Sequence, residues 1–247
     1  MLCASRDFKH KKLIVILGTV MIVLLAVFMG CTVYVNDYYR SEDTAIAAMA
    51  GTHDYTVEEY GGNIVFIPNE PAAGLIFYPG GKVEHTAYAP LMAEFADKGV
   101  LCVLVEMPFR LAVLDVNAAD GIQDNFHEIE KWYIGGHSLG GAMAASYISE
   151  HTGEFEGLLL LGAYSTADIS DSGLSVISVY GSEDKVLNME KYEENRGNLP
   201  SGFTELIIEG GCHSYFGNYG HQDGDGETTV SMEEQIQQTV EVFMESQ

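Results

Sequence analysis

The feature that most constrains this chain is a serine between glycines, in the segment Gly136-His137-Ser138-Leu139-Gly140. A short apolar run at 132–134 precedes it, and a run rich in small residues at 139–150 follows it. This order predicts a strand, a sharp turn and a helix, with Ser138 at the turn. Glycine on both sides removes side chains that would collide in so strained a turn. Ser138 is therefore a candidate nucleophile, and the N–H groups at the start of the helix can stabilise an oxyanion.

Short β-rich runs alternate with helix-forming runs from about residue 61 onward. The alternation predicts an α/β fold with a mostly parallel, doubly wound sheet covered on both faces. Only about a dozen residues separate the run that ends near residue 162 from the next, which leaves no room for an inserted lid domain. Ser231 and Glu234 have the spacing of a capping box at the start of the last helix. The expected strands are 63–68, 74–78, 100–105, 132–135, 157–161, 175–180 and 204–208, and the expected helices are 87–98, 118–131, 139–150, 189–195 and 232–244.

The N-terminal part carries a long apolar stretch at 13–35, with no Asp, Glu, Lys, Arg or His. Its length suffices to span a bilayer as a helix, and it exceeds the apolar region of a cleaved signal peptide. Four basic residues precede it and only Arg40 follows closely, which predicts a cytoplasmic N-terminus and an extracytoplasmic domain. A bacterial-type lipoprotein site that ends at Cys31, after Gly30, is an alternative, but Phe28 and Met29 fit the other positions of such a site poorly.

The chain divides by these patterns into three parts. Residues 1–36 are the expected cytoplasmic tip and transmembrane anchor, and 37–60 the expected helical linker, with an Ala-rich helix at 37–49. Residues 61–247 form the expected catalytic domain, because the length allows one sizeable α/β domain and not two.

The part outside the membrane is strongly acidic. Residues 31–247 hold 8 Lys and Arg against 35 Asp and Glu. Such a surface repels nucleic acid and anionic lipid, so a nucleic-acid partner is not expected. The simplest interpretation is that the charge keeps an exported domain soluble. The sequence does not indicate an oligomeric state.

The four cysteines are too scattered for a disulfide framework, and only Cys102 and Cys212 could pair outside the membrane. Cys212 precedes His213, which raises a thiol nucleophile as an alternative, but no cysteine-centred motif surrounds it. The acidic run 223–227 lacks the twelve-residue spacing of a calcium loop and is interpreted as a solvated loop. No metal site is predicted.

A serine nucleophile needs a base and an orienting acid, which follow it in the chain order Ser, Asp or Glu, His. The run 175–180 leads into Gly181-Ser182-Glu183-Asp184, where Asp184 is the expected acid and Glu183 the alternative. The run 204–208 leads into a Gly-rich loop with His213, the expected base. His221 and His137 are its competitors, although neither directly follows a strand.

Two further groups of residues complete the expected site. Leu139 and Gly81 are predicted to supply the oxyanion N–H groups, with Lys82 as the alternative to Gly81. Met107 and Phe109 follow the run 100–105, so they are expected at the carboxyl edge of the sheet, where they would line an acyl or leaving-group pocket. Ordinary loop packing is the alternative for this pair.

With Tyr78-Pro79-Gly80-Gly81, the 136–141 glycine-serine motif, 181–184 and Gly211-Cys212-His213 in this order, the chain resembles the lidless α/β-hydrolases related to dienelactone hydrolase. The resemblance covers about residues 61–247. It implies a Ser138, Asp184 and His213 triad and an acyl-serine mechanism on a small-molecule ester or related acyl compound, without a cofactor. Dienelactone hydrolases proper have cysteine at the nucleophile position, so their substrate is not carried over. Acyl transfer to a cell-envelope acceptor and a catalytically silent binding module remain alternatives.

Overall fold

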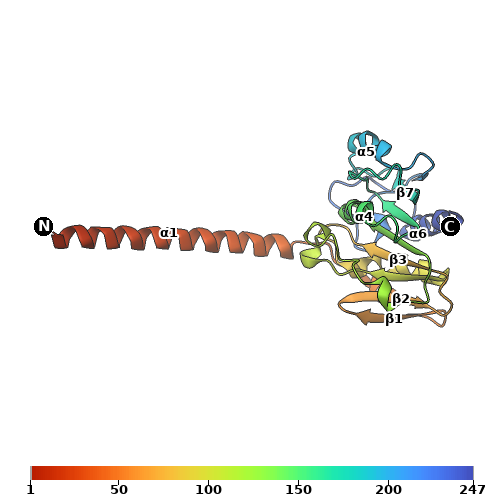
Figure 1. The fold of residues 1–247 in the computed structure, drawn as a ribbon, viewed down its shortest axis with the longest axis horizontal. Helices are drawn as coiled ribbons and strands as arrows, with labels where there is room; N and C mark the ends of the chain where they lie inside the picture. Colours follow the sequence, from red (N-terminus) through yellow and green to blue (C-terminus); the bar gives the residue numbers. More distant parts are fainter. Residues whose placement is uncertain (1, 247) are drawn as a thin grey trace. The chain divides into compact units, whose positions relative to one another are not determined.

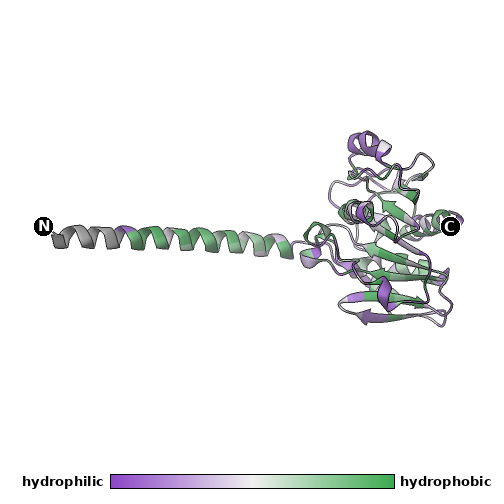
Figure 2. Cartoon of the chain, viewed as in Figure 1, coloured by the Kyte–Doolittle hydropathy of each residue, from purple (hydrophilic) through white to green (hydrophobic). Residues whose placement is uncertain are grey.

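The computed structural model describes the backbone of residues 2–246 and the side chains of residues 12–246. The chain folds as two compact units, Met1–Tyr38 and Tyr39–Gln247. The first is a single helix, α1 (Leu2–Asn36; Figure 1). Its part Lys12–Asn36 is long and apolar enough to cross a membrane, and Figure 2 shows the hydrophobic colour along it. The predicted apolar N-terminal helix is therefore confirmed.

The second unit is built on an eight-stranded sheet in the order β1-β2-β4-β3-β5-β6-β7-β8. The first two strands in this order pair antiparallel, as do β2 and β4, and every later pair is parallel. The strands are β1 (Tyr55–Tyr60), β2 (Asn63–Pro68), β3 (Ala73–Tyr78), β4 (Val100–Leu104), β5 (Trp132–His137), β6 (Gly157–Leu161), β7 (Ser175–Gly181) and β8 (Thr204–Ile208).

Helices cover both faces of this sheet. Helices α3 (Ala89–Asp97) and α6 (Met232–Glu245) pack on one face, and α4 (Leu139–Glu150) packs on the other. Strand β6 shows why its sequence is an unbroken apolar run: Leu159 and Leu161 point into the core under α3 and α6, whereas Leu158 and Leu160 point into the core under α4. The predicted doubly wound α/β fold is confirmed. Two shorter helices are α2 (Asp43–Ala48) and α5 (Met189–Asn195).

The helix predicted at 118–131 is wrong. This segment consists of turns with one short 3₁₀ helix, η4 (Gln123–Asn125). Gly121 adopts a φ of 70°, which lies outside the helical region, and the Asn125 side chain donates to its carbonyl at 3.0 Å. The apolar spacing that suggested a helix instead reflects Ala119, Ile122 and Ile129, which anchor these turns in the core under α4.

The segment 39–60 also differs from the prediction. Of the helix expected at 37–49, only α2 forms, because Tyr39 pairs with Val83 instead and the buried Ala45 donates its N–H to Asn218 Oδ1 at 2.8 Å. Strand β1, which was not predicted, adds to the edge of the sheet. Residues 39–60 therefore belong to the compact unit, and the boundary expected at residue 61 lies near residue 38.

Candidate active site

Ser138 lies at the turn between β5 and α4, as the motif predicts. Its φ and ψ are 53° and −122°, a region that non-glycine residues rarely occupy. A Cβ at Gly140 would lie 2.2 Å from the Tyr78 carbonyl oxygen, and one at Gly136 would lie 2.6 Å from the Gly140 carbonyl carbon. Both glycines are needed for β5, α4 and the end of β3 to approach this closely.

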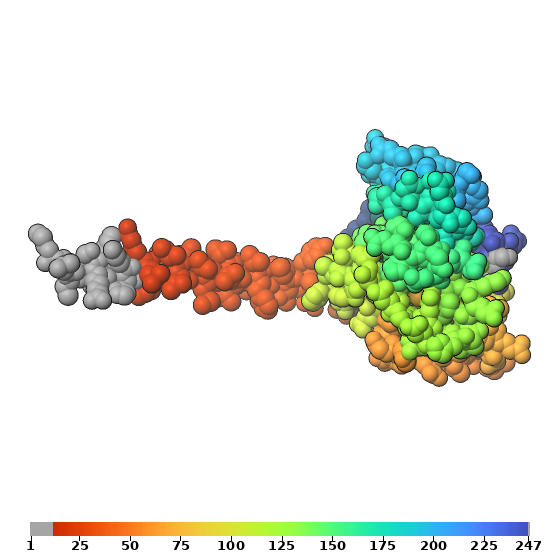
Figure 3. Space-filling model, viewed as in Figure 1, coloured from red at the N-terminus to blue at the C-terminus, as the bar shows by residue number. Residues whose placement is uncertain are grey.

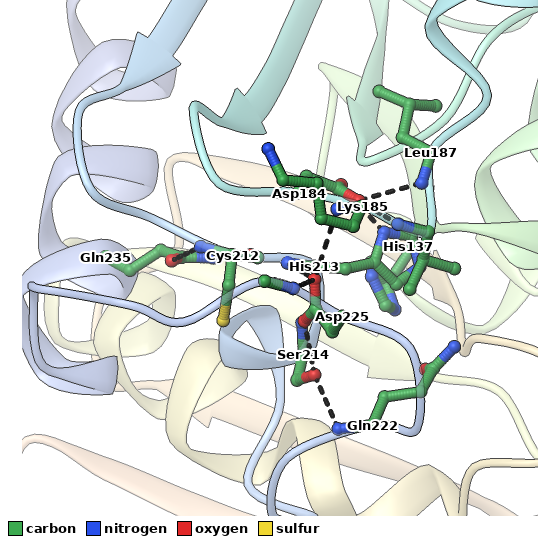
Figure 4. Close-up of polar contacts among 12 residues, drawn as sticks. His137, Asp184, Lys185, Leu187, Cys212, His213, Ser214, Gln222, Asp225 and Gln235 are labelled. Carbon is green, nitrogen blue, oxygen red and sulfur yellow. Dashed lines mark hydrogen bonds and ion pairs between the residues drawn. The ribbon is translucent and has the colours of Figure 1, made fainter.

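Asp184 and His213 come from the loops after β7 and β8 and meet at the same edge of the sheet. The His213 ring nitrogen Nδ1 lies 2.8 Å from Asp184 Oδ2, and both side chains are buried (Figure 4). Asp184 Oδ1 accepts the N–H groups of Val186 at 2.9 Å and Leu187 at 2.8 Å. The carboxylate is therefore held by the turn that carries it, and it fixes the orientation of the imidazole.

The second ring nitrogen of His213, Nε2, is buried and has no hydrogen-bond partner among residues 12–246. A pocket of about 280 Å³ contains both His213 and Ser138, together with Leu139, Gly162, Tyr164 and Leu187. This is the small end of the range for ligand pockets. The arrangement can take a proton from a serine hydroxyl and accommodate a small acyl or alcohol group.

Gly162, which the sequence reasoning missed, makes room for the Asp184 and His213 pair. It follows β6 with a φ of 51°. A Cβ there would lie 2.8 Å from His213 Nδ1, closer than Cβ atoms approach other atoms, and 3.2 Å from Asp184 Oδ2, a tight contact. Its only signal in the sequence is a glycine that directly follows a buried apolar run.

Asp225 is a second residue that the sequence reasoning missed, because its loop was interpreted as solvated. Its Oδ2 accepts from the Ser214 N–H at 2.8 Å and the Ser214 hydroxyl at 2.6 Å, and its Oδ1 accepts from the His213 N–H at 3.2 Å (Figure 4). Burial alone would raise the pKa of Asp225, but hydrogen bonds from Ser214, Gly226 and His213 outweigh it and lower the pKa. Asp225 thus fixes the backbone of the loop that carries the candidate base.

Cys212, His221 and Asp225 have ligand atoms within 4.8 Å of one another, close enough to hold a metal ion by distance alone. However, the Asp225 oxygens already accept five hydrogen bonds, including those from Lys185 and Gly226. Burial, reinforced by Asp225, also raises the pKa of the Cys212 thiol to about 12. These groups fit a metal poorly, and the protonated thiol fits a nucleophile poorly.

The competing acid and bases make other contacts, although the His137 ring lies against the His213 ring. Glu183 contacts Ser182 and Lys185 rather than His213. His137 is buried, with Nδ1 2.7 Å from the Tyr88 hydroxyl, and burial followed by the nearby His213 holds the pKa of His137 well below its usual value. His221 is exposed and lies beside Cys212 and Asp225. Of these groups, the structure brings Asp184 and His213 together.

The residues predicted for the oxyanion site lie side by side. Leu139 is the first residue of α4, so its N–H has no acceptor within the helix. A Cβ at Gly81 would lie 3.0 Å from Leu139 Cδ2, which puts Gly81 against Leu139. The Lys82 N–H donates to the Arg110 carbonyl at 2.9 Å, so the Gly81 amide is the better placed of these two predicted donors.

Met107 and Phe109 do not line the Ser138 pocket. They line a separate cavity of about 110 Å³ with Pro79, His85 and Arg110. Met107 is buried there, whereas the Phe109 side chain is mostly exposed. Their predicted place at the carboxyl edge of the sheet is correct, but the structure does not bring them to Ser138.

Comparison with known proteins identifies the family. The model of the alpha/beta hydrolase family matches residues 74–237, about two thirds of the chain. The protein belongs to this family, and it is a hydrolase of the α/β fold. No curated protein matches the chain by sequence.

Solved structures share the fold at low sequence identity. Dienelactone hydrolase from Anabaena variabilis is 14% identical, with 78% of this chain and 99% of that chain covered and a TM-score of 0.55. Est1E from Butyrivibrio proteoclasticus is 13% identical, with 78% and 98% covered and a TM-score of 0.55. Carboxylesterase CesB from Bacillus subtilis is 11% identical, with 69% and 88% covered and a TM-score of 0.52. The resemblance inferred from the motifs is confirmed at the level of the superfamily.

Proposed function

We propose that the protein is a serine hydrolase that cleaves carboxylic esters or related acyl compounds through Ser138, His213 and Asp184. The observation that carries the proposal is the buried Asp184 and His213 pair, whose free Nε2 belongs to the same pocket as Ser138. The likeness of the fold to a carboxylesterase and a dienelactone hydrolase agrees with this chemistry.

The proposed reaction runs through an acyl-serine intermediate. His213 Nε2 accepts the proton of the Ser138 hydroxyl as Oγ attacks the ester carbonyl carbon, and Asp184 stabilises the imidazolium that forms. The N–H groups of Leu139 and Gly81 stabilise the oxyanion. His213 then gives its proton to the departing alcohol, which leaves an acyl-Ser138 enzyme. Water, activated by the same imidazole, releases the acid and restores Ser138.

The apolar helix at 12–36 anchors this enzyme in the membrane, with the catalytic unit outside the cytoplasm. Support comes from the length and composition of the helix and from the basic residues that precede it in the sequence. Protease added to intact cells should degrade the catalytic unit. Degradation only after lysis would show that the catalytic unit faces the cytoplasm.

A fluorophosphonate probe tests the nucleophile directly, because it reacts with activated serines. Full-length protein should be labelled, and Ser138→Ala should not. Absence of labelling of the folded wild-type protein would refute the proposal in favour of a binding module.

Paired histidine variants test the base. His213→Ala should lower kcat on a soluble p-nitrophenyl ester by about 10³-fold or more, since loss of a triad member removes most of the catalytic power. His221→Ala is the matched control and should retain activity. The reverse pattern would assign the base to His221.

A further inference from the structure

Three exposed apolar side chains gather in one short segment of the compact unit. Phe109 is 61% exposed, Val113 53% and Leu114 56%, and we call residues 109–114 the apolar segment. Phe109 and Arg110 adopt φ values of 52° and 61°, so two consecutive non-glycine residues occupy the left-handed region. Such strain persists only where the surroundings hold it, and it often marks a functional segment.

The apolar segment lies beside the candidate active site. It contains most of η2 (Pro108–Arg110) and all of η3 (Ala112–Leu114), and η3 packs against α4, the helix that begins directly after Ser138. The Arg110 carbonyl accepts the N–H of Lys82, which follows the oxyanion residue Gly81. Figure 3 shows the yellow-green atoms of this segment at the surface, next to the green atoms of α4.

The chain that leaves the apolar helix joins the compact unit at the same place. Tyr39, the first residue of that unit, donates its N–H to the Lys82 carbonyl at 2.8 Å and accepts the Glu84 N–H at 2.9 Å. Lys82 is therefore hydrogen-bonded to Tyr39 through its carbonyl and to Arg110 through its amide. Tyr39 follows Asn36, the last residue of α1, by three positions, and three residues reach at most about 10 Å.

Resting on the proposed function of Ser138 and on the membrane anchor, we infer that the apolar segment dips into the bilayer surface. The enzyme then acts on amphiphilic esters that reside in that bilayer. The tether keeps this edge of the unit within reach of the lipid, and aromatic and aliphatic side chains partition into the interface. Because residues 31–247 carry a large excess of acid, the contact is local and apolar rather than a general attraction to anionic lipid.

The size of the pocket fits this substrate class. About 280 Å³ beside Ser138 holds the reacting ester group and a few carbons. The remainder of an amphiphile would lie outside the pocket, along Val113, Leu114 and Phe109, with its chain in the bilayer.

The first experiment compares two substrates with full-length protein reconstituted in phosphatidylcholine vesicles. One is a fluorogenic glycerolipid ester in the vesicles, and the other is soluble p-nitrophenyl acetate. The double variant Val113→Ser, Leu114→Ser should lose about tenfold or more of its rate on the vesicle ester, because each change removes a side chain that partitions into the interface. Its rate on the soluble ester should stay within about twofold of wild type. The control Tyr60→Ser, Ile207→Ser changes two exposed apolar residues elsewhere and should retain both rates.

The outcomes separate this inference from the proposed function. If the double variant and wild type hydrolyse the vesicle ester equally, or wild type hydrolyses only the soluble ester, the inference is overturned and the proposed function stands. If Ser138→Ala still hydrolyses the soluble ester, the proposed function itself fails.

A second measurement detects the contact without activity. The protein is prepared in a Cys3→Ser, Cys31→Ser background, and an environment-sensitive fluorophore is attached at Phe109→Cys or, as the control, at Ile207→Cys. In phosphatidylcholine vesicles, the fluorophore at position 109 should emit at a shorter wavelength than the fluorophore at position 207. Equal emission from both positions would overturn the inference.

Discussion

At the scale of single residues, the candidate base is fixed by three different means. Asp184 sets the rotation of the His213 ring through Nδ1, and Asp225 holds the His213 backbone through its N–H. Gly162 provides the space in which the pair lies. We expect the position of His213 to depend on all three, and misplacement of a catalytic group by about 1 Å can lower a rate by about 100-fold.

Asp225→Asn tests the backbone support. The substitution keeps one acceptor oxygen and replaces the other with an NH2 group, which donates and therefore accepts none of the hydrogen bonds that Asp225 receives at that position. We expect kcat on a soluble ester to fall by about 10–100-fold with KM little changed, as for a lost group that orients a catalytic residue. Asp223→Asn, in the same loop, is the matched control. Equal kcat in both variants, with unchanged circular dichroism, would show that the loop does not depend on Asp225.

The buried His137 predicts how stability depends on pH. Its pKa is held well below the usual 6.5, first by burial and then by His213, so the folded protein binds fewer protons there than the unfolded chain once the pH falls below about 6.5. Acidification from pH 7 to 5 should therefore lower the melting temperature. His137→Asn, whose oxygen can still face the Tyr88 hydroxyl, should show a shallower decrease. If the melting temperatures of the two proteins decrease in parallel as the pH falls, His137 is excluded as a source of the pH dependence.

A site residue could be predicted from the sequence where its position follows from a nearby strand. Ser138, Asp184 and His213 each lie in the turn or loop that follows a predicted strand, so the order of the strands alone indicated that they meet at one edge of the sheet. Asp225 lies twelve residues beyond His213 in a run of acids and glycines, and its role depends on a loop folding back on itself. The sequence pattern does not encode such a return. Met107 and Phe109 also follow a strand, but they line a separate cavity rather than the Ser138 pocket.

At the scale of helices and strands, central elements were predictable and peripheral ones were not. Strand β6 and helices α4 and α5 occur with the predicted bounds, because buried strands are continuous apolar runs and the helices have clear starts. Strand β1 was missed because its sequence, Tyr-Thr-Val-Glu-Glu-Tyr, leaves most of its side chains exposed at the sheet edge. Only pairing with β2 makes it a strand.

The capping box of α6 gives a prediction at this scale. The Ser231 hydroxyl accepts the Glu234 N–H at 3.2 Å, and the Glu234 carboxylate accepts the Ser231 N–H at 2.8 Å. Ser231→Ala should lower the free energy of unfolding by about 1 kcal/mol, a typical cost for losing an N-cap hydroxyl. Urea unfolding measures the loss, with the exposed Ser201→Ala as control. Activity should be unchanged, since the residues that line the Ser138 pocket come from other elements than α6.

At the scale of the whole molecule, both hydrophobic cores and the complete sheet lie within residues 39–247. A chain limited to these residues should therefore fold alone and hydrolyse a soluble ester with a kcat within about twofold of full length, because no residue of the proposed site precedes Tyr39. It should lose activity on vesicle esters. Circular dichroism and the two ester assays check this, and an unfolded or aggregated product would contradict it.

The positions of the thiols allow alkylation to report where the native structure opens. Cys31 is exposed on the apolar helix. Cys102 lies in β4 and Cys212 lies in the loop of the candidate base, and both of these thiols are free and buried. In a native molecule a soluble alkylating reagent reaches the two inner thiols only when the structure around them opens. The rate of alkylation at Cys212 would therefore report local opening of the catalytic loop. The rate at Cys102 would report unfolding of the sheet. Mass spectrometry of the two peptides would separate fluctuations of the active site from loss of the fold.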